Sequence, residues 1–274
     1  MNCVAEMPGP AALALVPGLE AGTPPLRLER LAGGTVNDSW RVDTLRGRFV
    51  LRVDGPAWRR PGVDRDREQR LHDAAAGAGL APRVLLRAAA VGAQVSEYLE
   101  GSVWRAADLS RPESLARLGE RLAQLHALEV PAGAARFDPE ACARQYLGLM
   151  DLGVAAATGA AAVVAAMRAA DERVADGSRG AGIIHGDLMH SNLLDGDALW
   201  FLDWEYAQRA DPLYDAACVL AYYPAARPHA RRLLAAAGLA GAGVDARLGA
   251  AIEVYQGLTW LWHGARGVAV GATG

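Results

Sequence analysis

Alternating apolar and polar positions characterise the first hundred residues of the chain. Residues 39–43 and 48–53 each alternate with a period of two, and Leu45-Arg46-Gly47 between them is typical of a hairpin turn. Residues 84–86 and 93–99 are also strand-like, whereas residues 71–76 favour a helix that Gly77 and Gly79 end. The pattern therefore predicts a small α+β lobe.

Beyond Gly101 the apolar positions recur at helical spacing. Ser110 and Glu113 have the spacing of a capping box, which predicts a helix start. One apolar stripe follows: Leu115, Leu118, Leu122, Leu125 and Leu128. Residues 141–175 and 228–262 are also predicted to be largely helical, and a β-prone island at 183–184 and 199–202 lies between these helices. The sequence thus divides into a loosely held leader (1–25), a small lobe (26–98) and a larger, mainly helical lobe (99–274).

Composition narrows the functional classes. With 52% hydrophobic and 22% charged residues the chain is globular, and its net charge of -3 provides no general attraction to nucleic acid. The most apolar run, residues 154–167, is too short to span a bilayer, so no membrane role is expected. The N-terminus is not expected to be a signal peptide, because prolines interrupt its apolar stretch. The three widely spaced cysteines suit a reducing compartment. A cytoplasmic protein is the expectation.

The β-prone island carries the densest polar motif. His185-Gly-Asp187 is followed at H-x-D-x-x-x-x-N spacing by Asn192, and Asp203 comes after the next apolar run. Transfer of a phosphoryl group from ATP needs a carboxylate to orient the attacking hydroxyl and oxygen ligands for Mg²⁺. Asp187 is the predicted catalytic base, and Asn192 and Asp203 are the predicted metal ligands. Aspartate and asparagine are also common turn residues, so each alone would also be compatible with a capping role.

This motif resembles the catalytic loop of the choline kinase and aminoglycoside phosphotransferase superfamily, relatives of the protein kinases. Leu202-Asp-Trp-Glu-Tyr-Ala207 and Asp211-Pro-Leu-Tyr-Asp-Ala216 are similar to the D-W-E-Y and D-P-x-x-D signatures of bacterial choline and thiamine kinases. The resemblance implies a bilobal protein-kinase-like α+β fold, with a small antiparallel-sheet lobe and a mainly helical lobe. It also implies ATP and Mg²⁺ as cofactors and a small-molecule hydroxyl as acceptor.

The resemblance extends to nucleotide-binding positions in the small lobe. It implies a loop over the phosphates, a phosphate-binding Arg52 with its partner Glu68, and a hinge at residues 96–101 whose backbone binds adenine. Arg52 could also be a solvated strand residue, and Glu68 stands in a run of charges typical of an exposed helix face. The predicted nucleotide-binding residues are Gly33, Gly34, Thr35, Asn37, Arg52, Glu68, Glu97 and Leu99.

Three aromatic residues near the C-terminus suggest an acceptor site. Tyr255 and Trp262 are seven positions apart and share a helix face, whereas Trp260 points about 160° away from Trp262. Core packing would account for them, but the π-face of Tyr255 or Trp262 could also hold a cation, with Glu205 adding negative charge. Choline or a similar amino alcohol is the favoured acceptor. Thiamine, an aminoglycoside or a sugar remains an alternative, as does a nucleotide-binding pseudokinase scaffold.

Overall fold

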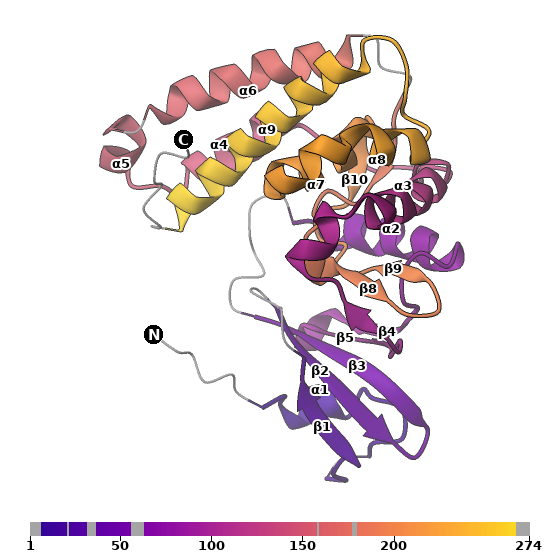
Figure 1. Ribbon diagram of the computed structural model, residues 1–274. Helices are drawn as coiled ribbons and strands as arrows, with labels where there is room; N and C mark the ends of the chain where they lie inside the picture. The colour runs from indigo at the N-terminus through magenta and orange to yellow at the C-terminus, as the bar shows by residue number, and fades with distance from the viewer. Residues whose placement is uncertain are drawn as a thin grey trace.

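The computed structural model describes residues 7–20, 22–31, 37–55, 63–157, 159–176 and 180–266. A sheet-containing lobe lies at one end and a larger helical lobe at the other (Figure 1). This arrangement confirms the predicted bilobal α+β fold. The predicted phosphate loop residues Gly33, Gly34 and Thr35 lie outside the described residues.

The small lobe is built on one five-stranded antiparallel sheet in the order β1-β2-β3-β5-β4. Its strands are β1 (Arg27–Arg30), β2 (Asn37–Thr44), β3 (Gly47–Asp54), β4 (Val84–Ala88) and β5 (Ala93–Glu97), with the 3-10 turn η1 (Ala89–Val91) before β5. The hairpin between β2 and β3 forms as predicted, with Thr44 paired to Gly47. Trp40, Val42, Leu51 and Val95 are buried on one face of this sheet, as the period of two requires.

The N-terminal segment is more ordered than the sequence suggests. Residues 7–20 were expected to belong to a loosely held leader, but the helix α1 (Pro10–Leu13) packs against the sheet. Val16 is only 1% exposed, and the Thr44 hydroxyl donates a hydrogen bond to the Pro17 carbonyl at 2.9 Å. The expectation failed because Ala12, Val16 and Leu19 together complete the apolar core of the sheet.

The helix α2 (Arg65–Gly77) belongs by its packing to the larger lobe. Leu71 and Ala75 join the hydrophobic cluster of the helical lobe, and the Phe201 amide donates to the Leu80 carbonyl at 2.8 Å. The N-cap is Asp64, whose side chain accepts from two backbone amides. A division of the chain at residue 98 therefore separates α2 from the residues that bury it.

Helices make up most of the larger lobe. They are α3 (Pro112–His126), α4 (Pro139–Leu147), α5 (Leu152–Ala157), α6 (Ala160–Ala175), α7 (Leu213–Tyr222), α8 (Ala230–Ala236) and α9 (Val244–Ala265), with 3-10 turns η2 (Ala106–Ser110) and η4 (Pro224–His229). The expected capping box is wrong: Ser110 donates to the Ala107 carbonyl, and α3 begins after Arg111 without a side-chain cap. Residues 228–262, predicted to be largely helical, contain α8 and most of α9, and the helices are separated by a segment in which Gly238 and Gly243 have positive φ.

Two small sheets hold the polar motif between the helices. The strand β7 (Gly182–Ile184) pairs with β10 (Gln208–Ala210), while β8 (Leu193–Asp195) pairs with both β6 (Ser102–Val103) and β9 (Leu199–Phe201). The loop between β7 and β8 contains Asp187 and the turn η3 (His190–Asn192). Within the described residues, no helix combines the length and apolar character that crossing a membrane requires.

The close approach of α3 to α8 generates a stability prediction. A Cβ added at Gly119 would lie 2.6 Å from the Leu233 carbonyl oxygen and 2.7 Å from Ala236 Cβ. We expect Gly119→Ala to lower the free energy of unfolding by about 1–3 kcal/mol, because α8 backbone must move. Denaturant unfolding measures this change.

Gly249→Ala provides the matched control for that experiment. Gly249 lies inside α9, and a Cβ there meets nothing within 4 Å. This variant should gain about 0.5–1 kcal/mol from helix propensity alone. Equal effects of the two substitutions would contradict the tight packing of α3 on α8.

Candidate functional site

Three side chains from two loops meet at the centre of the candidate active site. Asp187 follows β7, Asn192 ends η3, and Asp203 follows β9. The Asn192 amide Nδ2 donates to the Asp187 carbonyl oxygen at 2.8 Å and to its carboxylate Oδ2 at 3.1 Å. The five-residue spacing between Asp187 and Asn192 thus closes the loop on itself, while the Asn192 amide oxygen accepts a long hydrogen bond from the Ser191 hydroxyl at 3.4 Å.

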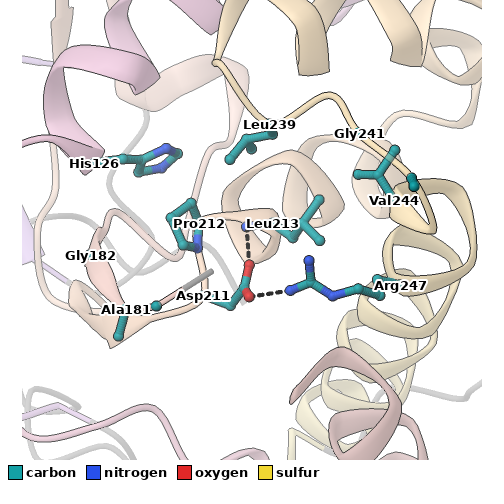
Figure 2. Close-up of a pocket in the computed structure, with 12 residues that line it drawn as sticks. His126, Ala181, Gly182, Asp211, Pro212, Leu213, Leu239, Gly241, Val244 and Arg247 are labelled. Atoms are coloured by element: carbon teal, nitrogen blue, oxygen red, sulfur yellow. Dashed lines mark hydrogen bonds and ion pairs between the residues drawn. The ribbon is translucent and has the colours of Figure 1, made fainter. Parts of the chain in front are cut away.

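A buried aspartate holds this loop from below. Asp215 accepts hydrogen bonds from the His185 amide at 3.1 Å and the Gly186 amide at 3.0 Å, and His126 Nε2 lies 2.9 Å from it. His126 and the neighbouring Asp211, which pairs with Arg247, line a cavity of about 210 Å³ behind the loop (Figure 2). Asp215 and His126 therefore have structural contacts.

His185 couples the loop to the strand that carries Asp203. Its Nε2 donates to the Leu202 carbonyl at 2.8 Å, while its Nδ1 accepts from the Asp187 amide at 3.3 Å. This pattern requires the neutral Nε2–H tautomer, and complete burial lowers the pKa of His185. The histidine fixes the relative position of Asp187 and Asp203 and is not placed to transfer a proton.

Gly186 is required by a close backbone approach. Its φ is 78°, and a Cβ would lie 2.6 Å from the Tyr206 carbonyl oxygen. A residue with a side chain would therefore push apart the loop bearing Asp187 and the segment that follows Asp203. The glycine in the H-G-D motif is explained by this contact.

Like charge is concentrated in the site. Burial and the carboxylates of Asp203 and Glu205 raise the pKa of Asp187 to about 7. Burial and Asp203 likewise raise the pKa of Glu205 to about 7, and burial raises the pKa of Asp203. Three carboxyl groups at one half-buried place favour the binding of cations.

The residues present fit a magnesium ion that is shared with a nucleotide. Asp203 has a left-handed φ of 61°, and its carboxylate Oδ1 is buried without a hydrogen-bond partner among the described residues. Asn192 supplies a second hard oxygen. Among the described residues, no cluster of three or more His, Cys, Asp and Glu side chains is arranged to hold a metal without a nucleotide. One or two protein oxygens plus phosphate oxygens is the usual arrangement for Mg²⁺.

A cavity of about 540 Å³ lies between the sheet and β8–β9 and contains the predicted nucleotide positions that the structure describes, except Glu68. Asn37, Arg52, Glu97 and Leu99 all line it, together with Asn192 and Asp203. No hydrogen bond within the described part of the chain uses the Leu99 backbone N–H, which leaves it open to a base. The Glu97 side chain instead binds Arg83.

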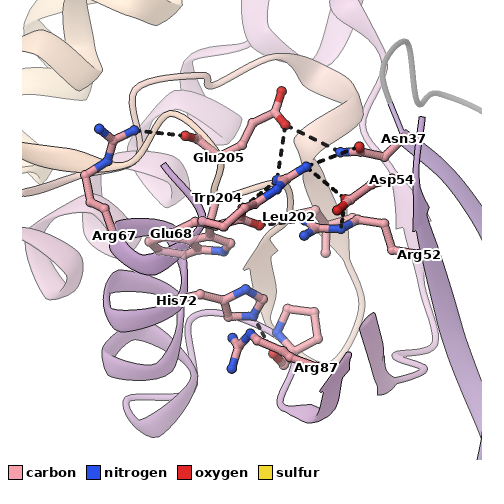
Figure 3. A network of polar contacts seen from close by, with 12 residues as sticks. Asn37, Arg52, Asp54, Arg67, Glu68, His72, Arg87, Leu202, Trp204 and Glu205 are labelled. Carbon is pink, nitrogen blue, oxygen red and sulfur yellow. Dashed lines mark hydrogen bonds and ion pairs between the residues drawn. The ribbon is translucent and has the colours of Figure 1, made fainter. Parts of the chain in front are cut away.

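Arg52 and Glu68 form the ion pair expected of them. Arg52 Nη1 lies 2.6 Å from Glu68 Oε1, and both side chains are largely buried, which excludes the exposed-face interpretation of Glu68. Burial alone would raise the pKa of Glu68, but Arg52 and Arg65 outweigh it and hold that pKa low. Figure 3 shows the two residues within one polar network. Their contact with phosphate stays a prediction.

A second cavity of about 430 Å³ opens on the other side of Asp203. Its lining includes the acidic residues Asp187, Asp203 and Glu205, and also the predicted acceptor residues Tyr255 and Trp262. Trp260 does not line it and packs against the core, as its opposite helix face requires. Asp203 lines both cavities, so the two spaces meet at the predicted metal ligand.

Several residues of the two cavities escaped the sequence analysis. Phe137, Tyr146, Tyr206 and Tyr222 add four aromatic rings to the second cavity. Only Tyr206 belongs to a recognised motif, as the tyrosine of the D-W-E-Y signature, but the sequence analysis assigned it no role; Phe137, Tyr146 and Tyr222 lie outside the recognised motifs. Tyr255 is 4% exposed and its hydroxyl donates to the Gly186 carbonyl at 3.2 Å, so it also supports the loop.

Comparisons with known proteins agree with this geometry. The model of the phosphotransferase enzyme family matches residues 27–251, and no curated protein sequence matches significantly. A choline/ethanolamine kinase family protein from Mesorhizobium loti is 29% identical over 92% of this chain and 83% of that chain, with a TM-score of 0.70.

Two further solved structures share the fold at lower identity. The choline kinase LicA from Streptococcus pneumoniae is 19% identical over 89% of this chain and 86% of its own, with a TM-score of 0.74. An aminoglycoside phosphotransferase with ADP bound is 14% identical, with coverages of 83% and 81% and a TM-score of 0.61.

Asp203 tests the electrostatic description of the site. We expect Asp203→Asn to raise the melting temperature of the ligand-free protein by about 2–4 °C, because one of three repelling carboxylates is removed and asparagine tolerates positive φ. The same variant should bind Mg·ATP about 10-fold or more weakly in calorimetry, since a hard anionic ligand is lost.

Asp66→Asn is the matched control, because Asp66 is exposed in the first turn of α2. It should leave both quantities close to those of the wild type. Unchanged Mg·ATP affinity in Asp203→Asn would exclude Asp203 as a metal ligand.

Proposed function

The chain belongs to the phosphotransferase enzyme family and is a small-molecule kinase, and from this premise we propose that it phosphorylates the hydroxyl of choline or a similar amino alcohol. The observation that carries the proposal is the charge and shape of the second cavity. Three acidic residues and six aromatic rings line it, whereas no arginine is among its lining residues. The chain has no lysine, since all 28 basic residues are arginine.

The proposed reaction assigns distinct tasks to the side chains at the junction of the cavities. Asp187 faces the acceptor cavity and would accept the proton of the acceptor hydroxyl as that oxygen attacks the γ-phosphorus of ATP and ADP leaves. In the ligand-free protein, burial and the neighbouring carboxylates raise the pKa of Asp187, which makes it a stronger base than an exposed aspartate. Asn192 and Asp203 would hold Mg²⁺, which when bound neutralises charge on the phosphates. Arg52 would contact phosphate oxygens from β3.

A small cationic alcohol suits the acceptor cavity better than a sugar or an anion. A trimethylammonium group has no N–H to donate in a hydrogen bond, and it is stabilised by aromatic faces and nearby carboxylates. The cavity of about 430 Å³ matches a small ligand, and its walls are mainly apolar. A phosphorylated or carboxylated acceptor would meet Asp187 and Glu205 and be repelled.

The solved structures support the same choice. The relative from Mesorhizobium loti is described as a choline/ethanolamine kinase family protein, and at 29% identity it is the more informative of the three. The aminoglycoside phosphotransferase shares the fold alone at 14% identity. Thiamine also carries a quaternary nitrogen and an alcohol, so it is the second candidate acceptor.

An acceptor panel tests the proposal. Purified protein with ATP and Mg²⁺ should release ADP with choline and related amino alcohols faster than with thiamine, an aminoglycoside or a sugar. Asp187→Asn should reduce turnover of the best acceptor by about 100-fold or more, because a positioned base is lost, while nucleotide binding persists. Preferred turnover of an uncharged sugar would overturn the assignment of the acceptor.

Trp262 tests the aromatic part of the cavity. It lines the pocket, and the Arg266 guanidinium lies 4.6 Å from its ring centroid, so its ring already takes part in one cation–π contact. We expect Trp262→Leu to raise the KM for choline about 2- to 30-fold, the range of a cation–π contact, with the KM for ATP unchanged.

Trp260→Leu is the matched control on the same helix. It should lower the melting temperature and leave the acceptor KM unchanged, because Trp260 packs against the core. If the two tryptophans behave alike, Trp262 acts only through packing.

A further inference from the structure

Arg65 lies at the centre of the polar network and has no role in the mechanism above. It is the first residue of α2, and its side chain is 23% exposed. Its guanidinium contacts four residues from three elements and the segment after β9: Glu68 at 2.5 Å, Asp54 at 2.9 Å, Asn37 at 3.4 Å and Glu205 at 3.6 Å. Asn37 begins β2 and Asp54 ends β3, so one arginine joins the sheet, α2 and the acceptor wall.

Only one of the two carboxylate oxygens of Glu205 is contacted by polar groups of the described residues. Its side chain is 2% exposed, and both Asn37 Nδ2, at 3.4 Å, and Arg65 contact the same oxygen, Oε2. No hydrogen bond or ion pair within the described residues reaches the other oxygen, Oε1, and Glu205 lines the acceptor cavity. Figure 3 shows Glu205 directed at Asn37 and away from the Arg67 side of the network. The carboxylate therefore stands between a protein cation and the acceptor space.

We propose that Arg65 sets the selectivity for cationic acceptors by competing with the acceptor for the charge of Glu205. This inference rests on the proposed function. Arg65 is not in the wall of the acceptor cavity, so it acts through Glu205 and is a positioning residue. A positive charge this close to Glu205 weakens the attraction that the same carboxylate offers to a second cation.

The competition also links the acceptor cavity to the nucleotide side. Arg65 and Arg52 share Glu68, each through a different oxygen. When an acceptor cation pairs with the Glu205 carboxylate, the contact of Arg65 with Glu205 weakens, and Glu68 and Asp54 remain as the anionic partners of Arg65. Its hold on Glu68 then strengthens, and Arg52 is freer to contact phosphate. Acceptor binding and nucleotide binding should therefore favour each other.

The test compares two acceptors of equal shape: choline, and the neutral alcohol in which carbon replaces its nitrogen. The measured quantity is the ratio of kcat/KM for choline to kcat/KM for the neutral alcohol. Arg65→Gln should raise this ratio about 5-fold or more, because the competing charge is removed. Arg65→Lys keeps the charge and should leave the ratio near that of the wild type. If Arg65→Gln does not fold, Arg65→Met carries the same expectation.

Two further variants show whether Arg65 acts through Glu205. Glu205→Gln should lower the ratio below the wild-type value, and Arg65→Gln should add nothing in that background. Arg70→Gln, at an exposed position of the same helix, should have no effect. A purely structural Arg65 would lower the melting temperature and kcat for both acceptors equally, and an unchanged ratio overturns the inference alone. A wild type that phosphorylates none of the cationic alcohols overturns the inference together with the proposed function.

Discussion

Repulsion among carboxylates in a half-buried cleft is the constraint on which the rest of this structure depends. Asp187, Asp203 and Glu205 raise one another's pKa or have it raised by burial, so the site is less stable than a neutral one would be. The fold opposes this repulsion with Arg52 and Arg65, which reach the cleft from the sheet and α2. The repulsion is tolerated because the hydrophobic core and the hydrogen bonds of His185 and Asp215 hold the loop that bears Asp187 in place.

The same constraint explains why α2 is shared between the lobes. Its apolar face packs with the helical lobe through Leu71 and Ala75, while its first turn directs Arg65 and Glu68 toward the sheet. The contacts of Arg52 with Glu68 and of Arg65 with Asp54 therefore join elements that do not share one hydrophobic core. Such polar ties are weaker than apolar packing and respond to charge, which suits a cleft that must admit a nucleotide.

Sequence reasoning predicted the parts of the molecule that depend on local pattern or on a motif. Period-two alternation identified β2 and β3, and the H-x-D-x-x-x-x-N spacing identified the loop that brings Asp187 to Asn192. It failed where tertiary contacts decide the outcome. Val16 orders the N-terminal segment by filling a gap over the sheet, and Ser110 caps no helix because its hydroxyl finds the Ala107 carbonyl. The aromatic rings of Phe137 and Tyr146 reach the acceptor cavity from the residue before α4 and from α4 itself. No local sequence pattern predicts that these rings line the same cavity as Tyr255 and Trp262.

The two cavities, which meet at Asp203, differ in the charges of the residues that line them. Arg52 lines the first cavity together with Glu97 and Asp203, whereas the residues that line the second cavity carry negative charge without an arginine. In the proposed reaction a cationic alcohol would be attracted to the second cavity, whereas the phosphates of a nucleotide in the first would be held by Arg52 and by the Mg²⁺ that Asn192 and Asp203 would bind. Once phosphate had been transferred to the proposed acceptor, the product would hold a dianionic group beside Asp187 and Glu205. The carboxylates proposed to favour binding of the alcohol would then repel its phosphate ester, so the same geometry would also favour release of the product.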